Sequence, residues 1–267
     1  MTRKLFSGVV LVCMGFMIAM NVKAQEQMSQ VQLFAIHQDI VIPSKAAEYE
    51  KASRNLAQLF ASNKMSTMSY TAANSEDFTY IYIMPVGDYA GLDKMEAGFN
   101  DLKMKIGDQL FMNAMDMFEG TYSSSSAYLI KYNPDLSYNP SYGSKTSDGL
   151  NFRHWDFYYV NPGMEQQAME IAKEWKDLFQ KHNIPEGYRI YVGDIGTEMP
   201  LIIVAQPARN AAEYYNNNQK NMETFGEEGQ QLMKKTMFAT RKMERKNGAI
   251  RPDLSYLPEQ MAEAENQ

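Results

Sequence analysis

The sequence predicts an α+β fold made of two tandem β-α-β-β-α-β repeats whose antiparallel sheets pack face to face. Three observations predict it: a recurring phrase, the same order of elements around each copy, and one open sheet face per copy. NPDLSY covers residues 133–138 and RPDLSY covers 251–256, an offset of 118 positions. His37 of HQD and His154 of HWD lie 117 positions apart. A nearly constant offset indicates a duplication.

Each repeat begins with a strand followed by a helix. The strands are predicted over 32–42 and 151–160, and Ser44 is the predicted N-cap of the first helix. Apolar residues recur at helical spacing in both helices, as in the core stripe of an amphipathic helix. They are Tyr49, Ala52, Leu56, Leu59 and Phe60 in the first repeat, and Ala168, Ile171, Trp175, Leu178 and Phe179 in the second.

Two strands, a second helix and a last strand complete each repeat. The paired strands are predicted over 66–72 and 78–84, and over 187–192 and 200–205, with Pro85 and Pro207 ending the later strand of each pair. The second helices are predicted over 88–117 and 208–235, interrupted at the glycines Gly98, Gly107, Gly226 and Gly229. The last strands are predicted over 124–132 and 238–246. This order is the ferredoxin-like pattern, with both helices on one face of a four-stranded antiparallel sheet.

The other face of each sheet is left open, and we expect the two open faces to cover each other. The predicted organisation is a cleaved signal peptide (1–24), a first ferredoxin-like repeat (31–138), a linker (139–150), a second ferredoxin-like repeat (151–256) and a flexible tail (257–267).

This arrangement resembles a dimeric α/β barrel fused into one chain. The superfamily includes NIPSNAP-type proteins, antibiotic-biosynthesis monooxygenases, and the chlorite dismutase and dye-decolourising peroxidase group. The resemblance covers about residues 31–256 and rests on element order and duplication, so it concerns the fold. It implies that the repeats supply to each other the pairing that single-repeat relatives obtain by dimerising. We therefore expect a monomer or a homodimer. No catalytic residue is carried over, because no family motif is found.

The first 24 residues are typical of a secretory signal: Arg3 and Lys4, a 16-residue apolar run, then small residues at Val22 and Ala24. The run is shorter than the ~20 residues of a membrane span. We therefore expect an exported protein of a bacterial cell envelope, periplasmic or extracellular, without a stable membrane anchor. Cleavage would remove Cys13, the one cysteine. Disulfides and thiolate chemistry are thereby excluded from the mature chain.

The net charge also excludes a class of partner. The full chain carries 26 basic and 32 acidic residues, and removal of the signal segment changes the net charge from −6 to −9. Such an acidic chain lacks the basic surface that a nucleic acid requires. The sequence also contains no phosphate-binding loop, serine-nucleophile motif or paired metal motif on a helix. The cofactor is therefore unknown, and none is required by the sequence.

The two His-x-Asp pairs are the candidate site. Alternation along a strand puts His37 with Asp39, and His154 with Asp156, on one face. The opposite face of the first strand is the more apolar (Phe34, Ile36, Ile40 and Ile42), and in the second repeat it carries Trp155, Phe157 and Tyr159. We expect the more apolar face to pack on the helices, so that both His-x-Asp pairs point into the barrel.

Three interpretations of the pairs follow. They are hydrogen-bonded structural pairs, or acid–base catalytic pairs, or ligands of a divalent metal ion in one shared site or in two separate half-sites. Tyrosines on the strands offer a flat amphipathic wall for a ligand, namely Tyr80, Tyr82 and Tyr158. The function expected first is the binding of a small, partly apolar ligand in the interior or mouth of the barrel. The alternatives are an oxygenase-like or metal-assisted enzyme that uses the His-x-Asp pairs, and a structural or interaction protein with a filled barrel.

Overall fold

A closed barrel of eight strands forms the centre of the protein in the computed structural model, which describes residues 32–140 and 149–258. The predicted signal peptide lies outside the described residues, as do most of the predicted linker and tail. The α+β fold class predicted from the sequence is confirmed. The strands are β1 (Gln32–Val41), β2 (Thr71–Ser75), β3 (Thr79–Gly87) and β4 (Tyr122–Tyr138) of the first repeat, and β5 (Phe152–Val160), β6 (Tyr188–Gly193), β7 (Leu201–Ala208) and β8 (Thr240–Ile250) of the second.

The two sheets are joined at both edges. The strand order around the barrel is β1-β3-β2-β8-β5-β7-β6-β4. Within each repeat the pairs are antiparallel, and β2 with β8 and β4 with β6 connect one repeat to the other. The two four-stranded sheets are therefore one continuous hydrogen-bonded barrel, and the face-to-face packing follows from its closure.

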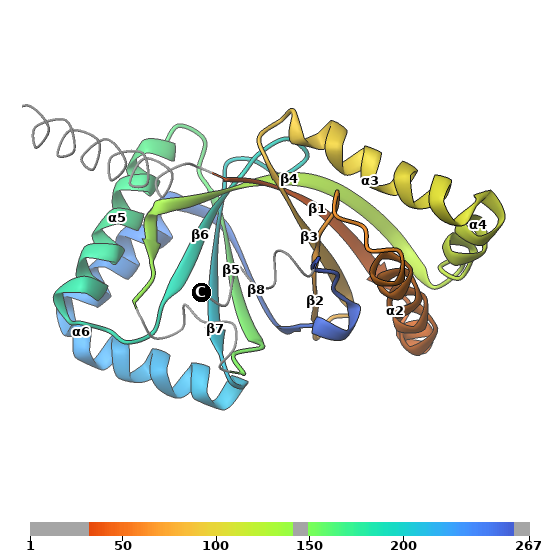
Figure 1. Ribbon diagram of the computed structural model, residues 1–267. Coiled ribbons are helices and arrows are strands. Elements are labelled where there is room, and N and C mark those ends of the chain that lie inside the picture. The colour runs from red at the N-terminus through yellow and green to blue at the C-terminus, as the bar shows by residue number, and fades with distance from the viewer. Residues whose placement is uncertain (1–31, 141–148, 259–267) are drawn as a thin grey trace, which may run out of the picture. The chain divides into compact units, whose positions relative to one another are not determined.

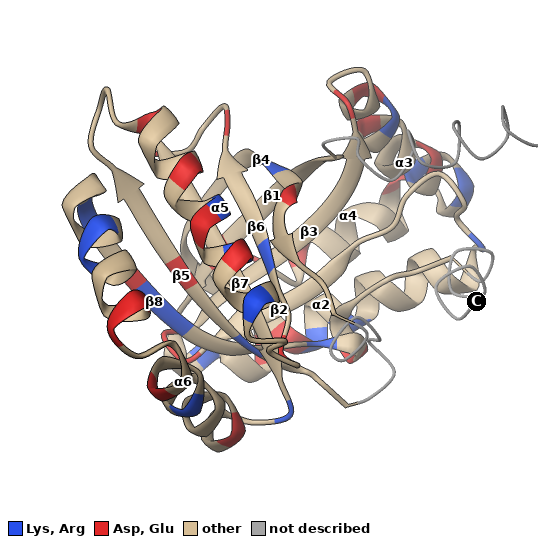
Figure 2. Ribbon diagram, turned by 90° about the vertical axis from the view of Figure 1, so that its left-hand side faces the viewer, with Lys and Arg blue, Asp and Glu red and all other residues tan. Residues whose placement is uncertain are grey.

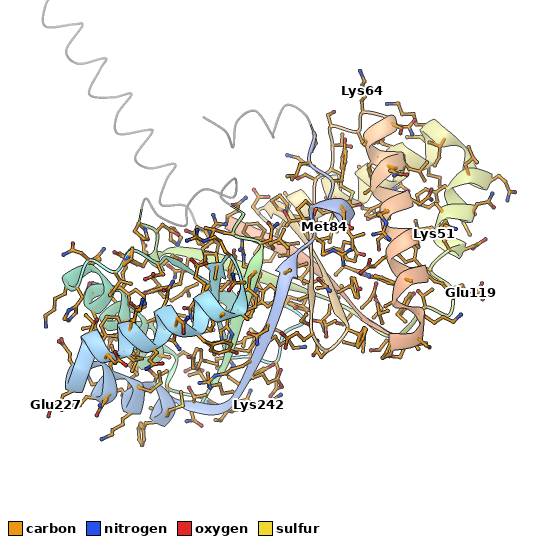
Figure 3. All side chains as sticks on the ribbon, turned by 90° about the horizontal axis from the view of Figure 1, so that it is seen from below. Lys51, Lys64, Met84, Glu119, Glu227 and Lys242 are labelled. Carbon is orange, nitrogen blue, oxygen red and sulfur yellow. The ribbon has the colours of Figure 1, made fainter. Side chains whose placement is uncertain are left out.

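The helices cover the outside of the barrel, those of the first repeat on one side and those of the second on the other (Figure 1). Charged residues are spread along the helices and along β8 (Figure 2). Exposed Lys51, for example, points away from the barrel (Figure 3). No helix of the described residues is long and apolar enough to cross a membrane. The helices are α2 (Ala46–Ser62), α3 (Gly91–Ile106), α4 (Asp108–Asp116), α5 (Glu165–Lys181) and α6 (Ala211–Ala239).

The second helix of each repeat is broken at an equivalent glycine, as the sequence predicted. Gly107 separates α3 from α4 with φ of 84°. Gly226, which lies 119 positions later, interrupts α6 with φ of 55° and ψ of −133°. Both conformations favour glycine, because a Cβ atom would be strained there. Gly98 and Gly229 lie within helical segments instead, with Met68 and Phe225 packed beside them.

Several predicted boundaries are wrong. Ser44 makes no side-chain cap, because a 3-10 turn (Pro43–Lys45) precedes α2. Asn74 lies within β2, opposite Tyr80, and not in the turn, so that the hairpin is shifted along the chain. Pro85 and Pro207 lie inside β3 and β7. Each is tolerated because one neighbouring strand has already ended there, so that fewer ladder hydrogen bonds are required.

The first strand of each repeat, β1 and β5, faces the opposite way from the expectation: its more apolar face points into the barrel and its His-x-Asp face points toward the helices. The barrel interior is packed with the more apolar side chains, among them Ile36, Trp155 and Tyr159. His37, Asp39, His154 and Asp156 face the helices instead: Asp39 is bonded to α2, and His154 stacks on a ring of α6. The interior of a closed barrel is screened from water all round, so the most apolar set packs there. The expectation that the His-x-Asp pairs point into the barrel is therefore wrong.

The PDLSY segment at the end of each repeat packs on the other repeat, so that the two repeats exchange equivalent segments. Leu254, in the 3-10 turn Pro252–Leu254, is fully buried against Tyr49 of the first repeat. Leu136, at the end of β4, is buried against Ala168 of the second repeat. Each phrase thus contributes its leucine to the helix–sheet layer of the other repeat.

The hydrogen bonds of the two phrases are equivalent. The hydroxyl oxygen of Ser255 accepts from the Ala72 N–H, and that of Ser137 accepts from the Ile190 N–H, at 2.9 Å in each case. The two tyrosine hydroxyls donate to carbonyl oxygens at equivalent places, Tyr256 to Met65 and Tyr138 to Ile184. The sequence repetition is therefore a structural requirement of the exchange.

Candidate functional site

His154 and Asp156 lie on β5 and face α6 from the outside of the barrel. Their side chains are almost fully buried, with exposed fractions of 4% and 9%. His154 Nε2 lies 3.3 Å from Asp156 Oδ1, and the same oxygen accepts a hydrogen bond of 3.2 Å from Arg245 Nε on β8. Asp156 therefore lies between a histidine and an arginine. The guanidinium of Arg245 extends into solvent, with 63% of the side chain exposed.

Both ring nitrogens of His154 are engaged. Nδ1 lies 2.7 Å from Asn247 Oδ1, and the amide nitrogen of Asn247 donates to the Tyr215 hydroxyl at 3.0 Å. The ring stacks on Tyr214 of α6, with centroids 4.3 Å apart and an interplanar angle of 18°. Burial, followed by the nearby negative charge of Asp156, raises the pKa of Tyr214 above its usual range. The imidazole is consequently held in one orientation.

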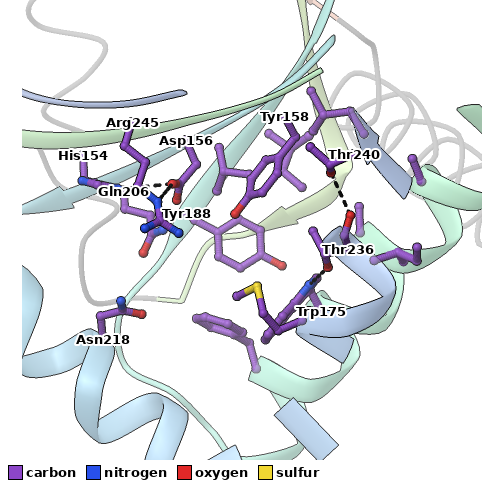
Figure 4. Close-up of a pocket in the computed structure, with 18 of the residues that line it drawn as sticks. His154, Asp156, Tyr158, Trp175, Tyr188, Gln206, Asn218, Thr236, Thr240 and Arg245 are labelled. Atoms are coloured by element: carbon purple, nitrogen blue, oxygen red, sulfur yellow. Dashed lines mark hydrogen bonds and ion pairs between the residues drawn. The ribbon is translucent and has the colours of Figure 1, made fainter. Parts of the chain in front are cut away.

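A cavity of about 260 Å³ opens beside this polar cluster, between the sheet and helices of the second repeat. His154, Asp156 and Arg245 lie at one end, and Tyr158 and Tyr188 project between that end and Trp175 (Figure 4). The remaining wall is mostly apolar, and it is drawn from β5, β6, β7, α5, α6 and β8. A largely apolar cavity with a few convergent polar groups is the usual form of a small-molecule site.

The same layer of the first repeat is filled with tyrosine side chains. Tyr49 occupies the α2 position equivalent to Ala168, and it is fully buried. The strand neighbour of Asp39 is Tyr80, whereas the strand neighbour of Asp156 in the second repeat is Val204. In the same way, the strand neighbour of His37 is Tyr82, whereas that of His154 is Gln206. Three tyrosines of the first repeat therefore correspond to alanine, valine and glutamine in the second, and these three smaller side chains line the cavity.

His37 and Asp39 form a separate pair in the first repeat. His37 Nε2 lies 3.1 Å from Asp39 Oδ2, and the Tyr49 hydroxyl donates to the same oxygen at 2.6 Å. Burial alone would raise the pKa of Asp39, but the hydrogen bonds from His37 and Tyr49 outweigh it and hold that pKa below its usual range. Tyr82, whose pKa burial raises to about 12, lies 2.5 Å from the Ser53 hydroxyl. This pair stabilises the structure, because tyrosines fill the space beside it.

The four His-x-Asp residues do not form one metal site. The two pairs face helices on different sides of the barrel, and within the described ranges no three His, Cys, Asp or Glu side chains gather where they would hold a metal ion. Of the three predicted ligand-binding tyrosines, Tyr158 lines the cavity, whereas Tyr80 and Tyr82 fill its equivalent in the first repeat.

The sequence reasoning missed several residues around the cavity. Tyr214 and Tyr215 come from α6 and reach β5 only once the helix has packed, and Arg245 lies directly opposite Asp156 on β8, a strand pairing that was not predicted. Tyr188 was predicted on a strand but was not assigned to a site. One signal was present in the sequence: the stripe position that is Tyr49 in the first repeat is Ala168 in the second. A large residue replaced by a small one in a duplicated core predicts empty space.

Comparisons with known proteins give structural similarity alone. No family model matches the sequence, and no curated protein matches it. An anthrone oxidase-like protein of known structure superposes with a TM-score of 0.55 at 11% identity, covering 84% of this chain and 93% of that one. A candidate monooxygenase from Lactobacillus acidophilus gives 0.53 at 7% identity, with 86% and 97% covered.

A third structure, a candidate monooxygenase from Fusobacterium nucleatum, gives a TM-score of 0.51 at 12% identity, with 82% of this chain and 92% of that one covered. At such identities the likeness concerns the fold and not the chemistry. The chain therefore has the dimeric α+β barrel fold that these structures share, with both four-stranded sheets of the barrel in one chain.

Proposed function

We propose that this protein binds a small, flat, largely apolar molecule in the cavity of the second repeat. One observation carries the proposal: the space that Tyr49, Tyr80 and Tyr82 fill in the first repeat is open in the second. Protein interiors are normally close-packed, and a cavity of this size costs stability. That cost indicates that the cavity has a function. Aromatic side chains, including Trp175 and Phe179, suit a flat ligand.

The test is isothermal titration calorimetry with 2-naphthol and naphthalene as probes. We expect saturable binding at one site, and a change in the fluorescence of Trp175, which Trp175→Phe removes. Ala168→Tyr places in the cavity the side chain that the first repeat has at this position, so it should abolish binding. Ala168→Ser, which keeps the volume, is the matched control. Absence of binding by the unmodified protein, or undiminished binding by Ala168→Tyr, contradicts the proposal.

A second candidate function is an oxygenase-like reaction in the same cavity. It is favoured by the placement of His154 and Asp156 at the cavity wall, where a carboxylate and an imidazole can move a proton from a bound substrate. The anthrone oxidase-like neighbour suggests anthrone as the first substrate to try. Oxygen uptake above the protein-free rate, lost in Asp156→Asn and His154→Gln, would support it. Uptake equal to the protein-free rate would exclude anthrone oxidation.

We further propose that the protein acts after export from the cell, with its signal peptide removed near Ala24. The composition of residues 1–24 supports this. The mass of the mature chain recovered from cell-envelope and medium fractions tests it, and a full-length chain in the cytoplasm contradicts it. We also propose that the chain is related to the tandem, NIPSNAP-like members of the fold, which the duplicated order of its elements supports. Because one chain closes the barrel, we propose a monomer or a homodimer, which light scattering distinguishes.

A further inference from the structure

One buried polar atom of the cavity has no partner. In the described part of the chain, Tyr188 is 5% exposed, and its hydroxyl oxygen is buried without a hydrogen bond. Two other buried side-chain atoms also have no partner, Asp39 Oδ1 and His182 Nε2, but only Tyr188 lines the cavity. Buried polar groups are almost always satisfied, and leaving one unsatisfied costs free energy. The Tyr188 hydroxyl therefore requires an explanation.

The Tyr188 ring is held firmly in place. Phe179 packs on it edge to face at 5.0 Å, and Tyr138 lies at 6.2 Å. Burial raises the pKa of Tyr188 above its usual range, so the hydroxyl keeps its proton and can donate. Tyr158 also extends into the cavity, and burial, together with the Asp156 charge, raises its pKa in the same way. The deep part of the cavity thus presents hydroxyl donors on fixed rings (Figure 4).

Other polar groups nearby are already committed. The indole N–H of Trp175 donates to the Thr236 hydroxyl at 2.9 Å, and that hydroxyl donates to the Leu232 carbonyl at 2.9 Å. Both nitrogens of His154 have partners at the other end of the cavity. A ligand that fills the depth of the cavity therefore meets mostly apolar surface, together with the Tyr188 hydroxyl, a buried donor that has no partner.

We propose that Tyr188 recognises the ligand by donating a hydrogen bond to an oxygen atom at its buried end, so that the ligand is an aromatic carbonyl compound or phenol and not a hydrocarbon. The inference rests on the proposed binding function. A site with a buried donor discriminates strongly against an analogue that lacks the acceptor, because the donor is then left unpaired. The polar cluster of His154, Asp156 and Arg245 lies at the other end of the cavity, where only the Arg245 side chain is largely exposed.

The experiment compares 2-naphthol with naphthalene, which has the same rings without the oxygen, by calorimetry. The unmodified protein should bind 2-naphthol about tenfold more tightly. Tyr188→Phe should remove this preference and leave the affinity for naphthalene unchanged. Tyr82→Phe, a buried tyrosine at the equivalent layer of the first repeat, should keep the preference.

Two results would overturn the inference while leaving the binding function intact. One is equal affinity for the two probes, and the other is a preference that Tyr188→Phe retains. If Tyr158→Phe alone removes the preference, the donor is Tyr158, and the assignment to Tyr188 is wrong. Failure of both probes to bind would instead contradict the proposed function, on which the inference depends.

Discussion

Tyr49 provides the sharpest test of how tyrosines fill the layer of the first repeat that is open in the second. Its ring is fully buried, with centroid distances of 4.8 Å to Tyr80 and 5.4 Å to Phe118. Its hydroxyl donates a hydrogen bond of 2.6 Å to the Asp39 carboxylate. Tyr49→Phe removes only the hydrogen bond to a charged acceptor, which we expect to cost about 2 kcal/mol. Tyr49→Ala also removes the ring, for which large-to-small core changes cost about 3–5 kcal/mol. Together they predict a loss of about 5 kcal/mol.

Urea and thermal unfolding measure both losses. For a chain of this size each kcal/mol corresponds to roughly 2–4 °C, so Tyr49→Ala should lower Tm by roughly 10–20 °C. The hydrogen bond also predicts a pH dependence. Because the folded pKa of Asp39 is lowered, its contribution to stability is present above the unfolded pKa and is lost as the pH falls. The cost of Tyr49→Phe should therefore be smaller at pH 3 than at pH 7. A cost below about 1 kcal/mol for Tyr49→Ala would refute the reasoning.

Three further predictions concern the rest of the fold. Leu254→Ala removes a fully buried side chain from the exchanged phrase and should cost about 2–5 kcal/mol in urea unfolding, whereas Leu136→Ala should cost less, because the second repeat is less tightly filled. A cost below about 1 kcal/mol for Leu254→Ala would contradict the exchange account. Hydrogen bonds from Arg251 lower the pKa of Glu50 to about 2, so the free energy of unfolding should fall as the pH drops from about 4.5 towards 2. Arg251→Gln should flatten that part of the pH profile, and an unchanged profile would show that the Arg251–Glu50 pair contributes nothing to stability. Gly226→Ala places a Cβ atom on a backbone with φ of 55°, so it should lower the free energy of unfolding in urea by about 1–3 kcal/mol. A stabilised variant would show that the break in α6 is not required.

The architecture was accessible from the sequence because it is encoded twice. The offset between NPDLSY and RPDLSY and the repeated element order together indicate the duplicated β-α-β-β-α-β fold. Glycines also indicate that the second helices are broken, although the breaks occur at Gly107 and Gly226 and not at Gly98 or Gly229. The role of PDLSY itself was not accessible. Its exchange between repeats depends on hydrogen bonds between residues 46 to 191 positions apart, which no local pattern records.

The candidate site was only partly accessible, and the reason is physical. Alternation correctly groups His154 with Asp156, but it does not say which face of the strand is inside. The more apolar face was assigned to the helices, whereas barrel closure makes the interior the drier layer, where Ile36 and Trp155 pack. The contribution of α6 through Tyr214 depends on tertiary packing. The cavity depends on what is missing at Ala168, which is visible only by comparison with the first repeat.

The most direct test of the central claim is a crystal structure of the protein with 2-naphthol bound. The account predicts the ring between α5 and the sheet of the second repeat, beside Trp175, with its oxygen within hydrogen-bonding distance of Tyr188 Oη. Ligand density inside the barrel beside Trp155, or in the first repeat beside Tyr49, would contradict it.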